Sequence, residues 1–81
     1  MRTIWLLITM DDIQVIGEKP VVSVFASEYA AYDAMRTDIL EHQRCGHFTT
    51  EEVEYAADGG FAQTRNRRYS WEIAETQVKG G

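Results

Sequence analysis

The side chains with the clearest chemical potential are His42, Cys45 and His47, which fall within six residues of one another. Imidazole and thiolate groups at this spacing can hold a metal ion, and a cysteine beside a histidine can act as a nucleophile with its base. A structural zinc site needs four ligands, however, and the chain has no other cysteine or histidine to complete one. No nucleophile signature surrounds Cys45. We therefore expect neither a metal site nor a catalytic residue.

Carboxylates are the most abundant charged groups, with thirteen acids against eight bases and a net charge of −5. Neither Asp11-Asp12 nor Glu51-Glu52 stands out as a tuned acid and base, so acidic pairs are interpreted as solvated surface. No glycine-rich nucleotide loop is present, and no cofactor is expected. Acidic surfaces suit a partner protein with a basic surface. The acids predicted to meet such a partner are Asp33, Glu41, Glu51, Glu52, Glu54 and Asp58.

The sign of the charge reverses near the end of the chain. Residues 1–64 contain eleven acids and four bases, whereas residues 65–81 contain two acids and four bases. Cations and aromatic rings mix here, a combination that can hold a phosphate backbone and stack bases. The candidate nucleic-acid contacts are Arg65, Arg67, Arg68, Tyr69 and Trp71. The acidic remainder favours the alternative, a basic loop that leads into a strand with buried aromatic rings.

Two strands are expected at the start of the chain. Residues 3–10 are rich in β-branched and aromatic types and apolar at both parities, which predicts a central strand covered on both faces. Asp11-Asp12 offers turn chemistry, and Ile13–Ile16 can continue as strand. A turn at residues 17–20 then leads into a second strand at Val21–Phe25, which together predict a hairpin.

A long helix follows from Ser27 to Cys45. Ser27 is a good N-cap residue, and Gly46 is suited to end the helix. One stripe of this helix is expected to face the sheet, and it consists of Ala31, Tyr32, Met35, Ile39 and His42.

The structure of residues 47–64 has two interpretations. Thr49 with Glu52 forms a capping-box pattern, and Phe48 with Val53 fits the hydrophobic staple, so a short second helix is favoured. A strand that turns at Asp58-Gly59 is the alternative, because Val53 and Tyr55 also alternate with glutamates.

A last strand is predicted where Tyr69, Trp71 and Ile73 alternate with more polar residues. A crossover through the long helix would lay it parallel to the first strand. The chain is therefore expected to form a single α+β domain, residues 1–81, with a three- to four-stranded sheet in the order ββα(α)β and helices packed on one face.

Helices on one face would leave the other face uncovered. Either Ile4, Leu6 and Ile8 or Trp5 and Leu7 would then point away from the helices. Trp5 and Leu7 are taken as the candidate interface, since a large exposed apolar patch commonly marks a contact with a second copy or another protein. The alternative is that a loop or residues 47–60 fold over this face.

Two family resemblances bear on function. The terminal Lys79-Gly80-Gly81 resembles the tail of ubiquitin-like and sulfur-carrier proteins, whose β-grasp domain also begins with a hairpin and a helix. This resemblance implies a carrier activated at Gly81.

Small size, acidity and the strand-to-helix run Val24–Ala31 resemble phage accessory proteins such as anti-CRISPR inhibitors. That resemblance implies an inhibitor that blocks a basic, nucleic-acid-binding surface of a host complex.

The sequence as a whole favours a non-enzymatic protein-binding module of the inhibitor type. A Gly-Gly carrier and a small binder of RNA or single-stranded DNA remain the alternatives. No apolar run approaches the roughly 20 residues of a membrane span, and no secretory signal is evident, so a cytoplasmic protein without membrane contact is expected, in the host if it is phage-encoded.

Overall fold

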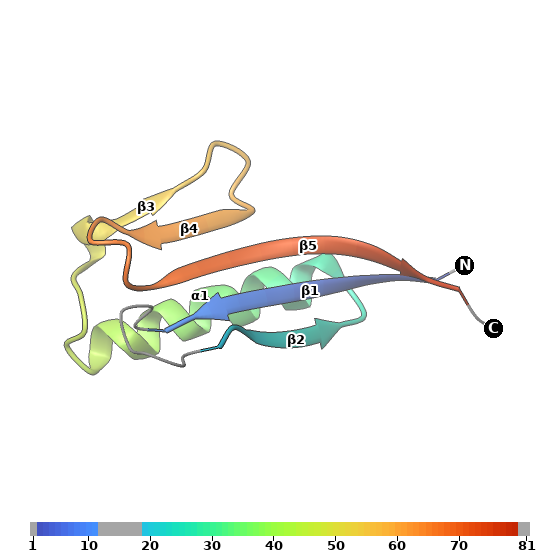
Figure 1. Ribbon diagram of the computed structural model, residues 1–81, viewed down its shortest axis with the longest axis horizontal. Helices are drawn as coiled ribbons and strands as arrows, with labels where there is room; N and C mark the ends of the chain where they lie inside the picture. The colour runs from blue at the N-terminus through green and yellow to red at the C-terminus, as the bar shows by residue number, and fades with distance from the viewer. Residues whose placement is uncertain (1, 12–18, 80–81) are drawn as a thin grey trace.

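The computed structural model describes residues 2–11 and 19–79, which form one antiparallel five-stranded sheet with one long helix against it (Figure 1). The elements in chain order are β1 Arg2–Met10, β2 Val21–Phe25, α1 Glu28–Arg44, a 3₁₀ turn Thr50–Glu52, β3 Val53–Tyr55, β4 Phe61–Thr64 and β5 Ser70–Val78. This architecture confirms the α+β class, with more strands than predicted. Within the described ranges, no helix has the length and apolar composition that a membrane crossing requires.

The strand order is β2-β1-β5-β4-β3, and every neighbouring pair is antiparallel. The predicted β1–β2 hairpin pairing is confirmed, although the expected extension Ile13–Ile16 lies outside the described residues. The expectation that the last strand runs parallel to the first was wrong. The strand that α1 leads into is β3, at the far edge of the sheet, and the chain then returns through β4 and β5. Two reversals therefore bring β5 beside β1 in the opposite direction.

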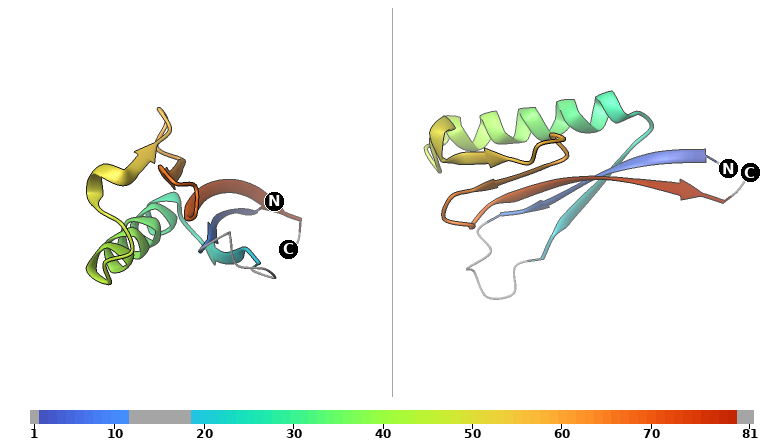
Figure 2. Two further views of the ribbon diagram at one scale, coloured as in Figure 1. Left: turned by 60° about the vertical axis from the view of Figure 1, so that its left-hand side comes forward. Right: turned by 90° about the horizontal axis from the view of Figure 1, so that it is seen from above.

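Helix α1 begins and ends where the sequence predicted. The Ser27 hydroxyl accepts a hydrogen bond from the Ala30 backbone N–H at 3.1 Å, and Gly46 follows the C-cap residue with a φ of 79°. Ala31, Met35 and Ile39 are buried on the side that faces the sheet. Figure 2 shows the helix along one side of the curved sheet, with the opposite side uncovered.

The predicted second helix does not form. Only one 3₁₀ turn follows Thr49, whose backbone N–H donates to the Glu52 carboxylate at 3.1 Å as the capping pattern anticipated. The alternative interpretation is confirmed, since β3 and β4 make a hairpin in which Asp58 Oδ1 accepts the Gly60 N–H at 2.9 Å. A helix of two turns is marginal in isolation, whereas the strand buries Val53 in the core and pairs its backbone with β4.

The core lies between α1 and one face of the sheet. Its buried members are Leu7, Met35, Ile39, Phe48, Val53, Ala62 and Trp71. Trp71 is fully buried, and its indole Nε1–H donates to Asp38 Oδ2 on α1 at 2.7 Å. A buried indole needs such an acceptor, so this bond fixes β5 against the helix.

The turn between β4 and β5 is organised by two polar side chains. Asn66 Oδ1 accepts hydrogen bonds from the buried Thr64 hydroxyl at 2.6 Å and from the Arg68 backbone N–H at 3.0 Å. Arg67 lies between them with a φ of 62°, in the left-handed region that favours glycine. The turn therefore carries backbone strain at one non-glycine residue.

The strain at Arg67 predicts opposite effects for two neighbouring substitutions that each remove one arginine. Arg67→Gly should stabilise the fold by roughly 0.5–1 kcal/mol because glycine adopts a positive φ without a steric penalty. Arg68→Gly should destabilise it by a similar amount through the added chain entropy. Thermal and urea unfolding would measure both, and equal destabilisation by the two variants would contradict the strained turn.

Candidate functional site

The face of the sheet turned away from α1 is the largest feature without a partner in the described structure. Residues opposite one another in an antiparallel pair share a face, so the register assigns every position. Leu7 is only 4% exposed and packs in the core on the helix side, and Trp5 has the same parity. The prediction that Leu7 forms an exposed interface was therefore wrong, and the register places Trp5 on the helix side too. The alternative set, Ile4, Leu6 and Ile8, points away from the helix.

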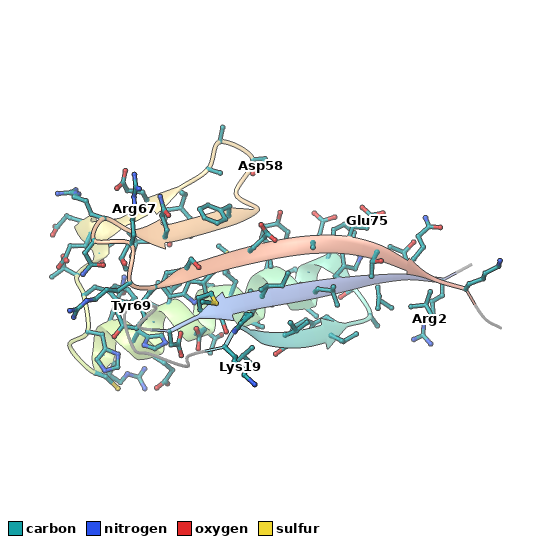
Figure 3. The ribbon with its side chains drawn as sticks, viewed as in Figure 1. Arg2, Lys19, Asp58, Arg67, Tyr69 and Glu75 are labelled. Carbon is teal, nitrogen blue, oxygen red and sulfur yellow. The ribbon has the colours of Figure 1, made fainter. Side chains whose placement is uncertain are left out.

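The register adds further apolar groups to this set. Val24 lies opposite Leu6, and Val22 lies opposite Ile8, and these valines are 61% and 54% exposed. Ala74 flanks Leu6 on the other side, and Phe61 follows on β4. We call this surface the open face, and its apolar members are Ile4, Leu6, Ile8, Met10, Val22, Val24, Phe61, Ala74 and Val78. Figure 3 looks onto the sheet from the side opposite α1.

Residues 47–60 do not cover the open face, contrary to the alternative raised from the sequence. Phe48 and Val53 of this segment are buried in the core on the helix side. β3 lies at the edge of the sheet and pairs only with β4. Among the described residues, the open face therefore has no cover from the chain itself.

The six acids predicted to meet a basic partner do not gather on one surface. Asp33 and Glu41 lie on α1, where the Glu41 carboxylate pairs with Arg44 at 3.3 Å. The others lie on the 3₁₀ turn and the β3–β4 hairpin, and two of these carboxylates, those of Glu52 and Asp58, accept hydrogen bonds from backbone groups of their own turns. Of these six acids, the ones whose carboxylates make no hydrogen bond or ion pair within the described residues are Asp33, Glu51 and Glu54.

The predicted nucleic-acid contacts divide between the surface and the core. Arg65, Arg67 and Arg68 are exposed in the β4–β5 turn, and the Arg65 guanidinium donates to the Glu51 carbonyl at 3.0 Å. The expected contact through Trp71 was wrong, because its ring is fully buried and cannot stack on a base. Tyr69 is half-buried, and its ring is stacked on that of His47.

The His42, Cys45 and His47 side chains do not converge as a set. The Nδ1 atoms of His42 and His47 are 2.8 Å apart, whereas Cys45 is exposed at the C-cap of α1. His42 instead points its Nε2 atom towards Asp38, one helical turn before it, and towards Asp11 at the end of β1. The spacing of Asp38 and His42 on a helix was a readable signal that sequence reasoning missed.

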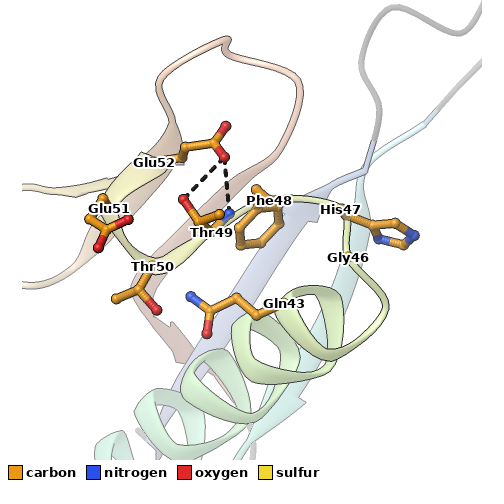
Figure 4. Close-up of a pocket in the computed structure, with 8 residues that line it drawn as sticks. All are labelled: Gln43, Gly46, His47, Phe48, Thr49, Thr50, Glu51 and Glu52. Carbon is orange, nitrogen blue, oxygen red and sulfur yellow. Dashed lines mark hydrogen bonds between the residues drawn. The ribbon is translucent and has the colours of Figure 1, made fainter.

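An open depression of about 500 Å³ lies beside this end of the helix (Figure 4). Its lining residues are Gln43, Gly46, His47, Phe48, Thr49, Thr50, Glu51 and Glu52. The Glu52 carboxylate is engaged with Thr49, as the dashed lines show, and His47 points away from the other side chains. We assign no reaction to this depression, because its side chains form no nucleophile–base pair.

Comparison with known proteins leaves the open face as the main guide to function. No protein-family model, curated protein or solved structure matches this chain.

Proposed function

We propose that the chain is a protein-binding module whose binding surface is the open face and whose occupant is a second copy of the same chain. The observation that carries this proposal is the cluster of apolar side chains around Leu6 on a sheet face that no described element covers, where Val22 and Val24 are exposed and Leu6 is half-buried. Contiguous apolar patches of this kind commonly mark interfaces in soluble proteins.

The size of the open face fits a weak, concentration-dependent pairing. The nine-residue strands β1 and β5 are about 30 Å long, and β2 and β4 are shorter, with five and four residues. Four adjacent strands span about 15 Å, so the flat footprint is at most about 450 Å². Stable interfaces bury about 800 Å² per partner, and smaller ones belong to weaker complexes.

Two opposite charges on the open face are spaced so that they can complement a second copy. Arg2 lies at one end of β1, and Glu72 lies opposite Ile8, about 20 Å further along the strand. A twofold axis that crosses the strands between Ile4 and Leu6 would bring Arg2 of each copy over the partner's Ile8, one strand away from the partner's Glu72. The apolar centre would then be flanked by two opposite-charge pairs, an arrangement that favours a self-complementary interface.

A basic protein partner and the inhibition of a nucleic-acid-binding complex stay predictions of the sequence. Pairing through the open face would leave α1 and the β3–β4 turn of each copy accessible to such a partner. Asp33, Glu51 and Glu54, whose carboxylates make no hydrogen bond or ion pair within the described residues, are the acids best suited to it. The carrier hypothesis rests on Gly80-Gly81, which lies outside the described residues.

The proposed pairing predicts that Leu6→Lys produces a monomer. A lysine at the centre of the interface would bury a charge against the partner's apolar side chains, which costs several kcal/mol. Sedimentation velocity at about 10–100 µM should show a dimer for the wild type. The matched control is Leu40→Lys, which makes the same chemical change away from the sheet, because Leu40 lies on α1 and is 53% exposed. A monomeric wild type, or a Leu6→Lys dimer as stable as the control, would contradict the proposal.

Burial of Trp71 and the net negative charge predict that nucleic acid is not the ligand. A gel shift with a single-stranded 20-nucleotide DNA or RNA at about 150 mM salt should show no complex at micromolar protein. The matched control is the double variant that carries both Arg67→Gln and Arg68→Gln, because it removes two exposed cations from the turn. A complex that forms with the wild type and is lost in this variant would show that the basic turn binds nucleic acid.

A further inference from the structure

A compact group of ligand-type side chains lies where the end of β1 meets the last turns of α1. We call it the Asp-His corner, and it consists of Asp11, Asp38 and His42. His42 Nε2 lies 3.4 Å from Asp11 Oδ1 and 3.6 Å from Asp38 Oδ2. One ligand atom from each of the three residues lies within 4.8 Å of the other two. Asp11 precedes Asp38 by 27 positions and His42 by 31 positions, and the fold brings the three side chains together.

We propose that the Asp-His corner binds a divalent transition-metal ion of the zinc type. Zinc lies about 2.0–2.2 Å from carboxylate oxygens and imidazole nitrogens. Two ligands of one tetrahedral ion are therefore about 3.4 Å apart, which agrees with both separations measured from His42. The two aspartate oxygens can reach the same spacing by rotation of the Asp11 side chain, which is 45% exposed.

The second nitrogen of His42 is already held as a metal-bound histidine requires. Its Nδ1 lies 2.8 Å from His47 Nδ1, so His42 can donate its proton there while Nε2 offers a lone pair to the ion. The His42 ring is also packed among Phe48, Tyr69 and Trp71, with ring centroids 5.1–6.2 Å away. Side-chain packing and one hydrogen bond thus orient the imidazole before any ion arrives.

The Asp38 carboxylate is oriented in the same way, whereas no hydrogen bond in the described structure fixes the Asp11 carboxylate. Asp38 Oδ2 accepts the Trp71 indole N–H at 2.7 Å. Asp11 Oδ1 is buried and has no hydrogen-bond partner, although His42 Nε2 is within ion-pair distance. Within the described ranges, neither carboxylate pairs with a lysine or arginine. A buried, unpaired oxygen beside a second carboxylate is costly, and a divalent cation would remove that cost.

The ligand set determines the class of ion. One imidazole and two carboxylates suit Zn²⁺, Co²⁺ and Mn²⁺ better than soft thiophilic ions. Three protein ligands leave at least one coordination position for water or for a donor from a partner. The ion would also tie the end of β1 to α1 more firmly than the contact between Asp11 and His42 does alone. This inference does not depend on the proposed pairing, because every ligand comes from one chain.

Calorimetric titration of the full chain with Zn²⁺, with its melting temperature measured in parallel, tests the proposal. We expect one ion per chain and a melting temperature that rises with Zn²⁺ concentration. Asp11→Asn and Asp38→Asn should each weaken binding at least tenfold, and the asparagine at 38 still offers an oxygen to the Trp71 indole. Glu41→Gln removes one carboxylate from the same helix outside the corner, and it should bind as the wild type does.

Two outcomes would overturn the assignment. The first is the absence of binding heat and of any melting-temperature shift at about 100 µM Zn²⁺ in the wild type, provided that the chain is folded by circular dichroism. The second is binding that survives Asp11→Asn and Asp38→Asn unchanged but is lost in Cys45→Ser. That result would place the ion among the helix-end residues His42, Cys45 and His47 instead.

Discussion

The structure depends on one constraint, which is that a single helix must cover a sheet in which β1 is apolar on both faces. α1 has 17 residues and is about 25 Å long, nearly the length of β1 and β5. It can cover one face, and that face receives Leu7, Trp71, Val53 and the other core side chains. Ile4, Leu6 and Ile8 on the opposite face belong to the same strand and need a second cover. Nothing in the described part of the chain supplies it.

The division between the two faces is fixed by hydrogen bonds as well as by packing. A slip of one residue in β5 would exchange its faces and expose Trp71. The indole bond to Asp38 on α1 opposes that slip, because a shifted strand would leave both the indole and the carboxylate without this partner. At the end of β4, the buried Thr64 hydroxyl donates a hydrogen bond to Asn66 and so fixes where the chain turns towards β5. These hydrogen bonds fix the register of the strands and so keep Trp71 on the helix side. The opposite parity, which includes Leu6, is therefore held on the open face.

Local signals in the sequence predicted the elements that local chemistry determines. The Ser27 cap, the stripe through Met35 and the hairpin into Val21–Phe25 all depend on near neighbours in the chain. The structure of the segment after Thr49 was harder to predict. Its capping hydrogen bond forms, but only one 3₁₀ turn follows it. Strand pairing with Phe61–Thr64 and burial of Val53 decided its structure, and neither is visible in a short window.

The candidate sites also contain a part that near neighbours in the sequence predict and a part that only the tertiary fold determines. The uncovered face was predicted, but the sequence could not decide which parity faced the helix, since both are apolar in β1. The pair of Asp38 and His42 follows from helical spacing. Asp11 joins them only through the tertiary fold, and so does Trp71. Cys45, the most conspicuous chemical group in the sequence, is left at the exposed end of the helix.

Intermolecular nuclear Overhauser effects can show whether two copies meet through the open face. An equimolar mixture of ¹³C-labelled and unlabelled chains would be examined with an isotope filter. We expect intermolecular contacts for the methyl groups of Ile4, Leu6, Ile8 and Val24, and none for those of Leu40. Intermolecular contacts confined to Leu40 and its neighbours on α1, or none from any methyl group at millimolar protein, would contradict the proposed pairing.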